Sequence, residues 1–120
     1  MTQELAQVTG RLEAGGRVVI VRGEVDVSNA GEVYDLIGAT IAREDTAVVI
    51  DLTDIQYLDS SAIRLLFRLA ERLKRNRQNL AFAVGESGAA RKILDIAGIS
   101  GQYPCRPDAS AALVALAAAT

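Results

Sequence analysis

The chain has 120 residues, half of them apolar, and its 13 basic and 15 acidic residues give a net charge of −2. A chain of this size can form one domain with its own core, and the near-balanced charge gives it no general affinity for nucleic acid or an anionic membrane. The single cysteine, Cys105, excludes an internal disulfide, and the lack of histidine argues against a zinc site or histidine-based catalysis.

The ends of the sequence carry no segment typical of secretion or membrane insertion. The first four residues include an acid and no apolar core, so no secretory signal is predicted. Residues 109–119 are apolar but too short and too rich in alanine to cross a bilayer. We therefore expect a soluble cytoplasmic protein.

The first half of the chain predicts three strands and one helix. Residues 5–12 alternate loosely, as in an edge strand, and residues 17–23 contain a run of β-branched side chains typical of a stronger strand. Ser28 is expected to cap a helix that runs to about residue 43. Residues 47–52 form a short β-branched run, typical of a central strand buried on both faces. The apolar face expected for the helix consists of Val33, Leu36, Ile37 and Ile41.

The second half begins with the clearest helix, which follows a loop at residues 53–60. Residues 80–84 then predict a strand, and residues 87–97 predict a helix closed by Gly98. A short edge strand is expected within residues 102–106, and Asp108 is expected to cap a terminal helix. The apolar stripe of the clearest helix consists of Ala62, Leu65, Leu66, Leu69, Ala70 and Leu73.

Strands that alternate with helices predict one α/β domain, in which functional sites tend to lie beyond the carboxyl ends of the strands. This rule points to the loops at residues 24–28 and 53–60. The second loop ends in Asp59 and Ser60 at the start of the clearest helix. Either residue is suited to cap the helix, and capping alone would explain why these two residue types occur here without any further role.

A functional interpretation is that Ser60 accepts a phosphate. The start of a helix tolerates a dianion, because its dipole and free N–H groups favour negative charge. The phosphate would add a charge of about −1.5 to −2 beside Asp59 and disturb a partner's contact while leaving the fold intact. Capping and phosphorylation are compatible.

The same helix has a flank that lies between its apolar stripe and an arginine-rich arc at residues 64–77. Ile63 and Phe67 lie on this flank, which Phe67 shares with Ser60 and Arg64. One alternative is that Phe67 packs under a neighbouring loop. The other is that the flank is a docking surface with an apolar contact beside a charge.

Two other functions are less well supported. An enzyme that uses the carboxylates of Asp51, Asp54 and Asp59 would lack a nucleophile–base pair, a phosphate-binding glycine loop and metal-ligand spacing. Nucleic-acid binding through the arginine arc conflicts with the net charge and the small number of aromatic residues. We therefore expect the arc to be a solvated helix face.

Three segments in order resemble the STAS domain of anti-sigma factor antagonists. Residues 48–52 (Val-Val-Ile-Asp-Leu) and 57–62 (Tyr-Leu-Asp-Ser-Ser-Ala), followed by an amphipathic helix, resemble the central motif. Residues 23–26 (Gly-Glu-Val-Asp) resemble the segment before the family's first helix. Residues 89–98, with the run Lys-Ile-Leu-Asp-Ile-Ala-Gly at 92–98, resemble its third helix and the following glycine. The resemblance covers roughly residues 5–115.

The resemblance implies a single STAS domain over residues 1–120, with a mixed β-sheet of four to five strands and about four α-helices. It implies a binding protein that is not an enzyme and needs no cofactor or metal. The implied partner is an anti-sigma factor that is also a serine kinase; the unmodified antagonist binds it and frees a sigma factor. The kinase then phosphorylates Ser60, and a phosphatase reverses this. We expect the partner-binding residues to be Asp26, Asp59, Ser61, Ile63, Arg64 and Phe67.

The sequence departs from the family pattern at two positions. Ala62 stands at a position where antagonists usually have glycine, and Arg64 stands at a position where they often have a second glycine. A bulky charged residue so close to Ser60 predicts recognition by a different kinase or slower phosphorylation. A non-switching scaffold subunit of a stressosome-like or lipid-transport complex is the alternative function.

Overall fold

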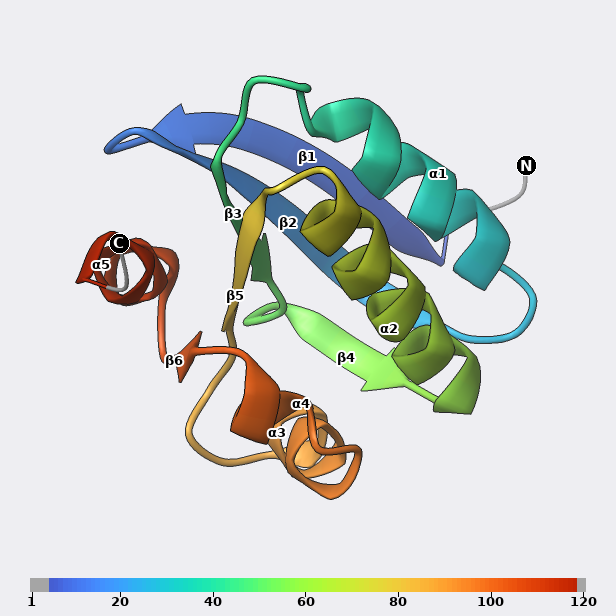
Figure 1. Cartoon of the computed structure of the whole chain (residues 1–120). Helices are drawn as coiled ribbons and strands as arrows, with labels where there is room; N and C mark the ends of the chain where they lie inside the picture. The colour runs from blue at the N-terminus through green and yellow to red at the C-terminus, as the bar shows by residue number, and fades with distance from the viewer. Residues whose placement is uncertain (1–4, 119–120) are drawn as a thin grey trace.

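A mixed β-sheet organises the structure, a computed structural model that describes residues 5–118 (Figure 1). Within these residues the sheet has six strands, in the order β1-β2-β3-β5-β6, and β4 pairs with β2 beside this path. β1 and β2 are antiparallel, and every other pairing is parallel. The strands are β1 (Ala6–Glu13), β2 (Gly16–Val25), β3 (Ala47–Asp51), β4 (Ile55–Leu58), β5 (Asn79–Ala83) and β6 (Cys105–Arg106).

Helices cover both faces of this sheet. Figure 1 shows α1 and α2 on one side of β3 and β5, and α5 on the other side. Within the described residues the helices are α1 (Ala30–Thr40), α2 (Ser60–Arg75), α3 (Ala89–Ile96), the short α4 (Ile99–Gln102) and α5 (Ala109–Ala118). None of them is both long and apolar enough to cross a membrane.

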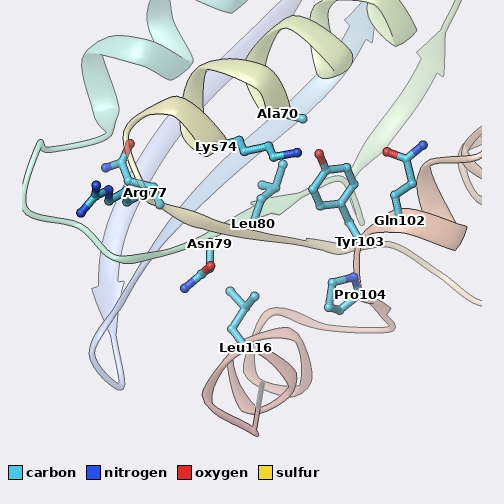
Figure 2. Close-up of a pocket in the computed structure, with 10 residues that line it drawn as sticks. Ala70, Lys74, Arg77, Asn79, Leu80, Gln102, Tyr103, Pro104 and Leu116 are labelled. Carbon is cyan, nitrogen blue, oxygen red and sulfur yellow. The ribbon is translucent and has the colours of Figure 1, made fainter. Parts of the chain in front are cut away.

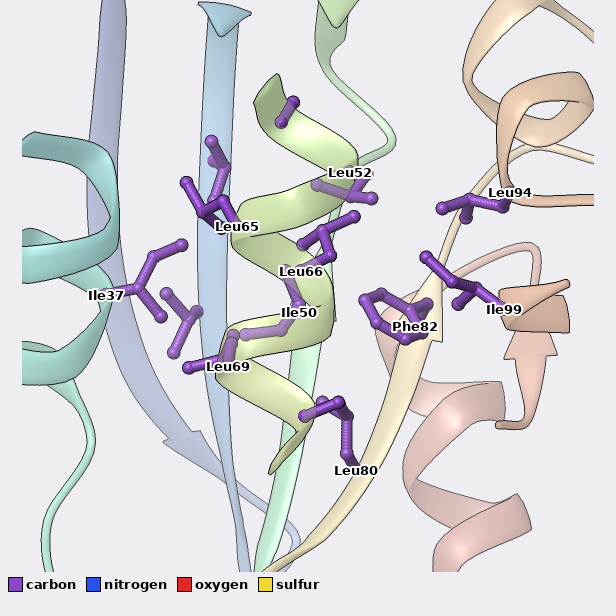
Figure 3. Close-up of a cluster of buried hydrophobic side chains, with 14 of the residues drawn as sticks. Ile37, Ile50, Leu52, Leu65, Leu66, Leu69, Leu80, Phe82, Leu94 and Ile99 are labelled. Carbon is purple, nitrogen blue, oxygen red and sulfur yellow. The ribbon is translucent and has the colours of Figure 1, made fainter. Parts of the chain in front are cut away.

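The main core lies between α2 and the sheet (Figure 3). Leu66 and Leu69 of α2 pack in one cluster with Ile50 of β3, Ile37 of α1 and Phe82 of β5. Every residue of the predicted α2 stripe is buried, so that prediction is confirmed. A 3.6-residue period that continues over three turns allows only one face of the helix to meet the core.

A second, smaller core lies under α5. Ala112 and Leu113 of this helix pack against Val18, Val49 and Ala81 on the opposite face of the sheet. The alanines of α5 and β5 are small, which lets the helix approach the sheet closely. The alanine-rich tail of the sequence is therefore a second layer of the fold, and Asp108 caps it by accepting a hydrogen bond from the Ala111 N–H at 2.8 Å.

The structure confirms the α/β class and corrects several details. The loop predicted at residues 53–60 contains β4, and α4 was not expected, so there is one strand and one helix more than the ranges predicted. The first helix ends at Thr40 rather than near residue 43. Leu36, expected in the core, is 42% exposed because α1 turns only Val33 and Ile37 fully inward.

Ser28 is not the cap of α1. Asn29 occupies the N-cap position and makes no capping hydrogen bond with its side chain. The Ser28 hydroxyl and backbone N–H both donate to the Asp26 carboxylate instead. The predicted cap therefore serves the preceding loop rather than the helix.

Candidate functional site

The two loops singled out by the sequence meet at one edge of the sheet. β2 and β4 run parallel, with Val25 opposite Leu58, so the residues that follow them leave the sheet side by side. The Asp59 N–H donates a hydrogen bond to the Val25 carbonyl oxygen at 3.3 Å. This pairing brings the Asp26 loop next to the start of α2, where Ser60 lies.

Gly23 permits this arrangement at the end of β2. Its φ of +93° is a conformation that L side chains rarely adopt, and a Cβ atom here would collide with the carbonyl oxygen of Leu5. The pairing of β2 with β4 also shifts register between Gly23 and Glu24. The glycine of the Gly-Glu-Val-Asp segment therefore has a backbone role that positions Asp26.

Asp59 caps α2. Its backbone is extended, with φ −118° and ψ −168°, and its Oδ1 accepts hydrogen bonds from the Ser61 N–H at 2.8 Å and the Ala62 N–H at 3.2 Å. Of the two capping candidates, the structure thus assigns the role to Asp59. Ser60 becomes the first residue of the helix, and its side chain is exposed.

The Ser60 hydroxyl is available for chemistry. Within residues 5–118 it makes no hydrogen bond, whereas Ser61 accepts one from the Arg64 guanidinium at 3.5 Å. Ser61 is also half-buried. The two adjacent serines therefore differ in their surroundings, since Ser60 is exposed without a hydrogen bond and Ser61 is half-buried with one.

Asp26 is held in place by its own loop. Its Oδ1 accepts hydrogen bonds from the Ser28 hydroxyl at 2.5 Å and from the Ser28 N–H at 2.8 Å. These bonds lower the pKa of Asp26, and the bond from the hydroxyl has the larger effect, so the carboxylate is charged at neutral pH. Asn29 fixes the loop further, because its side chain accepts from the Asp26 N–H and donates to the Glu24 carbonyl, both at 2.9 Å.

The predicted flank of α2 is only partly open. Ile63 and Phe67 are half-buried and pack against the main core, whereas the packing alternative placed Phe67 under a neighbouring loop. Arg64 is exposed and lies beside Ser61. The flank therefore presents a charge next to the edges of two apolar side chains rather than a free apolar surface.

Two exposed apolar residues near this edge were not predicted. Val27, in the Asp26 loop, is 78% exposed, and Tyr57, in β4 opposite Glu24, is 51% exposed. Val27 follows the end of β2 and Tyr57 lies near the end of β4, so both residues lie near the start of α2. The exposure of Tyr57 could have been predicted from the alternation of side chains along a strand, because Tyr57 precedes buried Leu58. That prediction requires residues 55–58 to be recognised as a strand.

The other carboxylates considered in the sequence have structural partners. Asp51 accepts hydrogen bonds from the Thr53 hydroxyl at 2.6 Å and the Thr53 N–H at 2.9 Å. Asp54 pairs with Arg22 at 3.3 Å. Within the part of the chain that the structure describes, no three acidic or cysteine side chains gather in a way that could hold a metal ion.

Comparison with known proteins gives one family. The sequence model of the STAS domain matches residues 6–112. The chain is 30% identical over 78 residues to the anti-sigma-F factor antagonist RsfB of Mycobacterium tuberculosis. That alignment covers 65% of this chain and 62% of RsfB, so it spans only part of that relative.

Solved structures agree with this result. An anti-sigma factor antagonist from Mycobacterium paratuberculosis has a TM-score of 0.81 and 27% identity, with 92% of both chains covered. The anti-sigma factor antagonist SpoIIAA from Bacillus, in its unphosphorylated form, has a TM-score of 0.73 over 93% of this chain and 97% of that one. Its identity is 15%, so this second likeness concerns the fold. Since the family's sequence model covers nearly the whole chain, this protein belongs to the STAS domain family.

Proposed function

We propose that this protein is an anti-sigma factor antagonist controlled by phosphorylation of Ser60. In its unphosphorylated form it binds an anti-sigma factor that is also a serine kinase, and this binding releases a sigma factor. Phosphorylation of Ser60 by the same kinase ends the binding, and a phosphatase restores it. The names of RsfB and of the Mycobacterium paratuberculosis protein support the antagonist role.

The observation that carries the proposal is the position of the Ser60 hydroxyl. It is exposed on the first turn of α2 and makes no hydrogen bond with the described residues. Asp59 already caps the helix, so the hydroxyl of Ser60 can change chemically without loss of the cap. A kinase can therefore reach this hydroxyl on the folded protein.

A phosphate at Ser60 is compatible with the fold but not with a docked partner. Inside the protein the positive end of the α2 dipole favours the added charge. In an interface the same charge of about −1.5 to −2 would be desolvated beside the carboxylates of Asp59 and the adjacent Asp26 loop. The partner would need new donors to compensate for it, so affinity falls.

The proposed partner surface surrounds Ser60. The charged and polar contacts come from Asp26, Asp59, Ser61 and Arg64, of which Arg64 is the most open. Ile63 and Phe67 contribute only their exposed edges. To these predicted residues we add Val27 and Tyr57, because both are apolar and exposed at the same edge of the sheet. This proposed role is binding, without catalysis and without a cofactor.

The phosphorylation step can be tested with the cognate anti-sigma kinase and ATP. We expect one phosphate per chain, located on Ser60 by mass spectrometry. Ser60→Ala should abolish phosphate uptake and retain partner binding, while Ser61→Ala, the matched control, should still be phosphorylated. Undiminished uptake by Ser60→Ala would show that Ser60 is the wrong residue.

A non-switching STAS scaffold subunit is the second candidate, and Arg64 is the observation that favours it. The Arg64 guanidinium donates a hydrogen bond to the Ser61 hydroxyl oxygen at 3.5 Å, so a charged side chain lies next to the residue that follows Ser60, at a position where the family pattern often has glycine. A scaffold would bind its partner but take up no phosphate in the same kinase assay.

A further inference from the structure

A pocket of about 390 Å³ lies at the opposite end of α2 from Ser60 (Figure 2). It is bordered by the last turns of α2, the start of β5, the segment between α4 and β6, and the end of α5. At 1.5 Å per residue, Lys74 lies about 20 Å along the helix from Ser60. The pocket is therefore separate from the surface proposed for the anti-sigma partner.

The pocket has an apolar floor and a polar rim. The floor wraps around the edge of β5, with Ala70 and Leu80 on the α2 face of the sheet and Leu116 of α5 on the opposite face, and it includes Pro104. The rim carries Lys74, Arg77, Asn79, Gln102 and Tyr103, and none of the described residues that line the pocket is acidic. An apolar cavity of this size with a few converging polar groups is the usual form of a small-molecule site.

The positive charges of the rim lack counter-charges. Within residues 5–118, neither Lys74 nor Arg77 belongs to an ion pair. Figure 2 shows the Lys74 ammonium extending over the pocket toward Tyr103, while Arg77 stands at the other end of the rim. Gln78 also lines the pocket, but its amide nitrogen is already committed to the carbonyl oxygens of Ala42 and Asp45, at 2.9 and 2.8 Å.

Arg77 occupies a backbone position that suits glycine better. It follows α2 with a φ of +58°, and the Arg77 and Gln78 N–H groups donate to the carbonyl oxygens of Lys74 and Leu73, at 3.1 and 2.8 Å. This pair of bonds is a Schellman motif, in which glycine is the preferred residue at the left-handed position. The chain thus places a cation at the pocket rim although its backbone is strained there.

We propose that this pocket binds a small organic anion with an apolar body. The apolar body would lie across the edge of β5, against Leu80 on one side and Pro104 and Leu116 on the other, and the acidic group would meet the Lys74 ammonium. The Tyr103 hydroxyl and the Gln102 amide lie on the same side of the rim and supply further hydrogen bonds to that group (Figure 2). A lysine ammonium is a compact charge with three donors, which suits a carboxylate, sulfonate or phosphate without requiring one fixed geometry.

The proposal can be tested with two matched probes, the fluorescent anion anilinonaphthalene sulfonate and its neutral analogue phenylnaphthylamine. We expect saturable one-to-one binding of the anion to the full chain, and at least about fivefold weaker binding of the neutral analogue, a difference of about 1 kcal/mol. Amide NMR shifts caused by the anion should be confined to residues that line the pocket.

Variants on adjacent positions of α2 provide the control. Lys74→Gln should weaken binding of the anion by at least about fivefold, whereas Arg75→Gln removes the same charge outside the pocket and should change it by less than about twofold. Tyr103→Phe removes only the hydroxyl and keeps the ring, which packs edge-on against the Phe82 ring with the two ring centroids 6.1 Å apart. This variant should bind the anion more weakly and the neutral probe with unchanged affinity.

Three results would overturn the proposal. If Lys74→Gln and Arg75→Gln weakened binding of the anion equally, the attraction would be a general effect of positive charge. If the two probes bound with equal affinity, the pocket would make an apolar contact without recognising the anion. Shifts centred on Val27 or Tyr57 would place the probe at the other end of the molecule.

Discussion

Asp59 and Ser60 are neighbours in the chain but hold different positions at the start of α2. Aspartate and serine are about equally good N-cap residues, so sequence patterns alone assign the cap to either. The extended backbone of Asp59 and its two accepted hydrogen bonds decide the matter. The sequence was enough to predict a candidate hydroxyl at the start of this helix. It could not predict that Asp59 rather than Ser60 caps the helix, because this depends on a backbone angle that no sequence pattern specifies.

The cap assignment predicts unequal effects of two alanine substitutions. Asp59→Ala should lower the free energy of unfolding by about 0.5–2 kcal/mol, because two helix N–H groups lose their acceptor. Ser60→Ala should change it by less than about 0.5 kcal/mol, because an exposed hydroxyl without a hydrogen bond is removed. Urea unfolding of both variants measures this difference, and the reverse order of stabilities would contradict the assignment.

Asp45 is a buried carboxylate whose charge the folded state stabilises. Its side chain is 7% exposed and accepts hydrogen bonds from the Arg17 guanidinium and the Ala42 N–H, each at 2.8 Å. Burial by itself raises the pKa of Asp45, but the bonds from Arg17 and Ala42 outweigh burial, and the pKa lies below its ordinary value of 3.8. This stabilisation is therefore present above the unfolded-state pKa and is lost as the pH falls through the lower native value.

We expect the free energy of unfolding to decrease below about pH 4, in part through Asp45. Asp45→Asn should be less stable than the natural protein at pH 7 and should lose less stability on acidification. Asp54→Asn is the control, because the Asp54–Arg22 pair is exposed and its removal should cost less than about 1 kcal/mol. Urea unfolding at pH 7 and pH 3 tests this, and an identical acid dependence in Asp45→Asn would rule out the role of Asp45.

Helix α2 and strand β4 mark what element patterns can and cannot predict. The stripe of α2 repeats over many residues, so its face could be predicted before the fold was known. β4 has four residues, too few to show a period, and it exists as a strand because it pairs with the end of β2. In α5, alanine occupies most faces, so the side that meets the sheet is chosen by Leu113, Leu116 and the fold around them.

The burial of α2 predicts large losses at its core positions. Leu66→Ala or Leu69→Ala should lower the free energy of unfolding by about 2–5 kcal/mol, because each leaves a cavity under the helix. Leu36→Ala on α1 is the matched control, since Leu36 is 42% exposed and should lose clearly less. Urea unfolding curves distinguish the two sets, and losses below about 0.5 kcal/mol at Leu66 and Leu69 would mean that the stripe does not face the core.

The whole molecule places its two proposed sites at opposite ends of α2. The alternation of strands and helices was enough to predict an α/β class, but the position of β4 beside β2 required the three-dimensional fold. That pairing brings Asp26, from early in the chain, next to Asp59 and Ser60. The sequence thus singled out Asp26, Asp59 and Ser60, whereas the exposure of Val27 and Tyr57 at the same edge became apparent only in the fold.

Titration calorimetry of the anti-sigma partner with unphosphorylated and Ser60-phosphorylated protein tests the central claim most directly. Circular dichroism of both forms is the control for the fold. We expect phosphorylation to weaken binding by at least about tenfold, or about 1.4 kcal/mol, with an unchanged spectrum. Equal affinities of the two forms, with the fold intact, would contradict the switch and leave a protein that binds its partner regardless of phosphate.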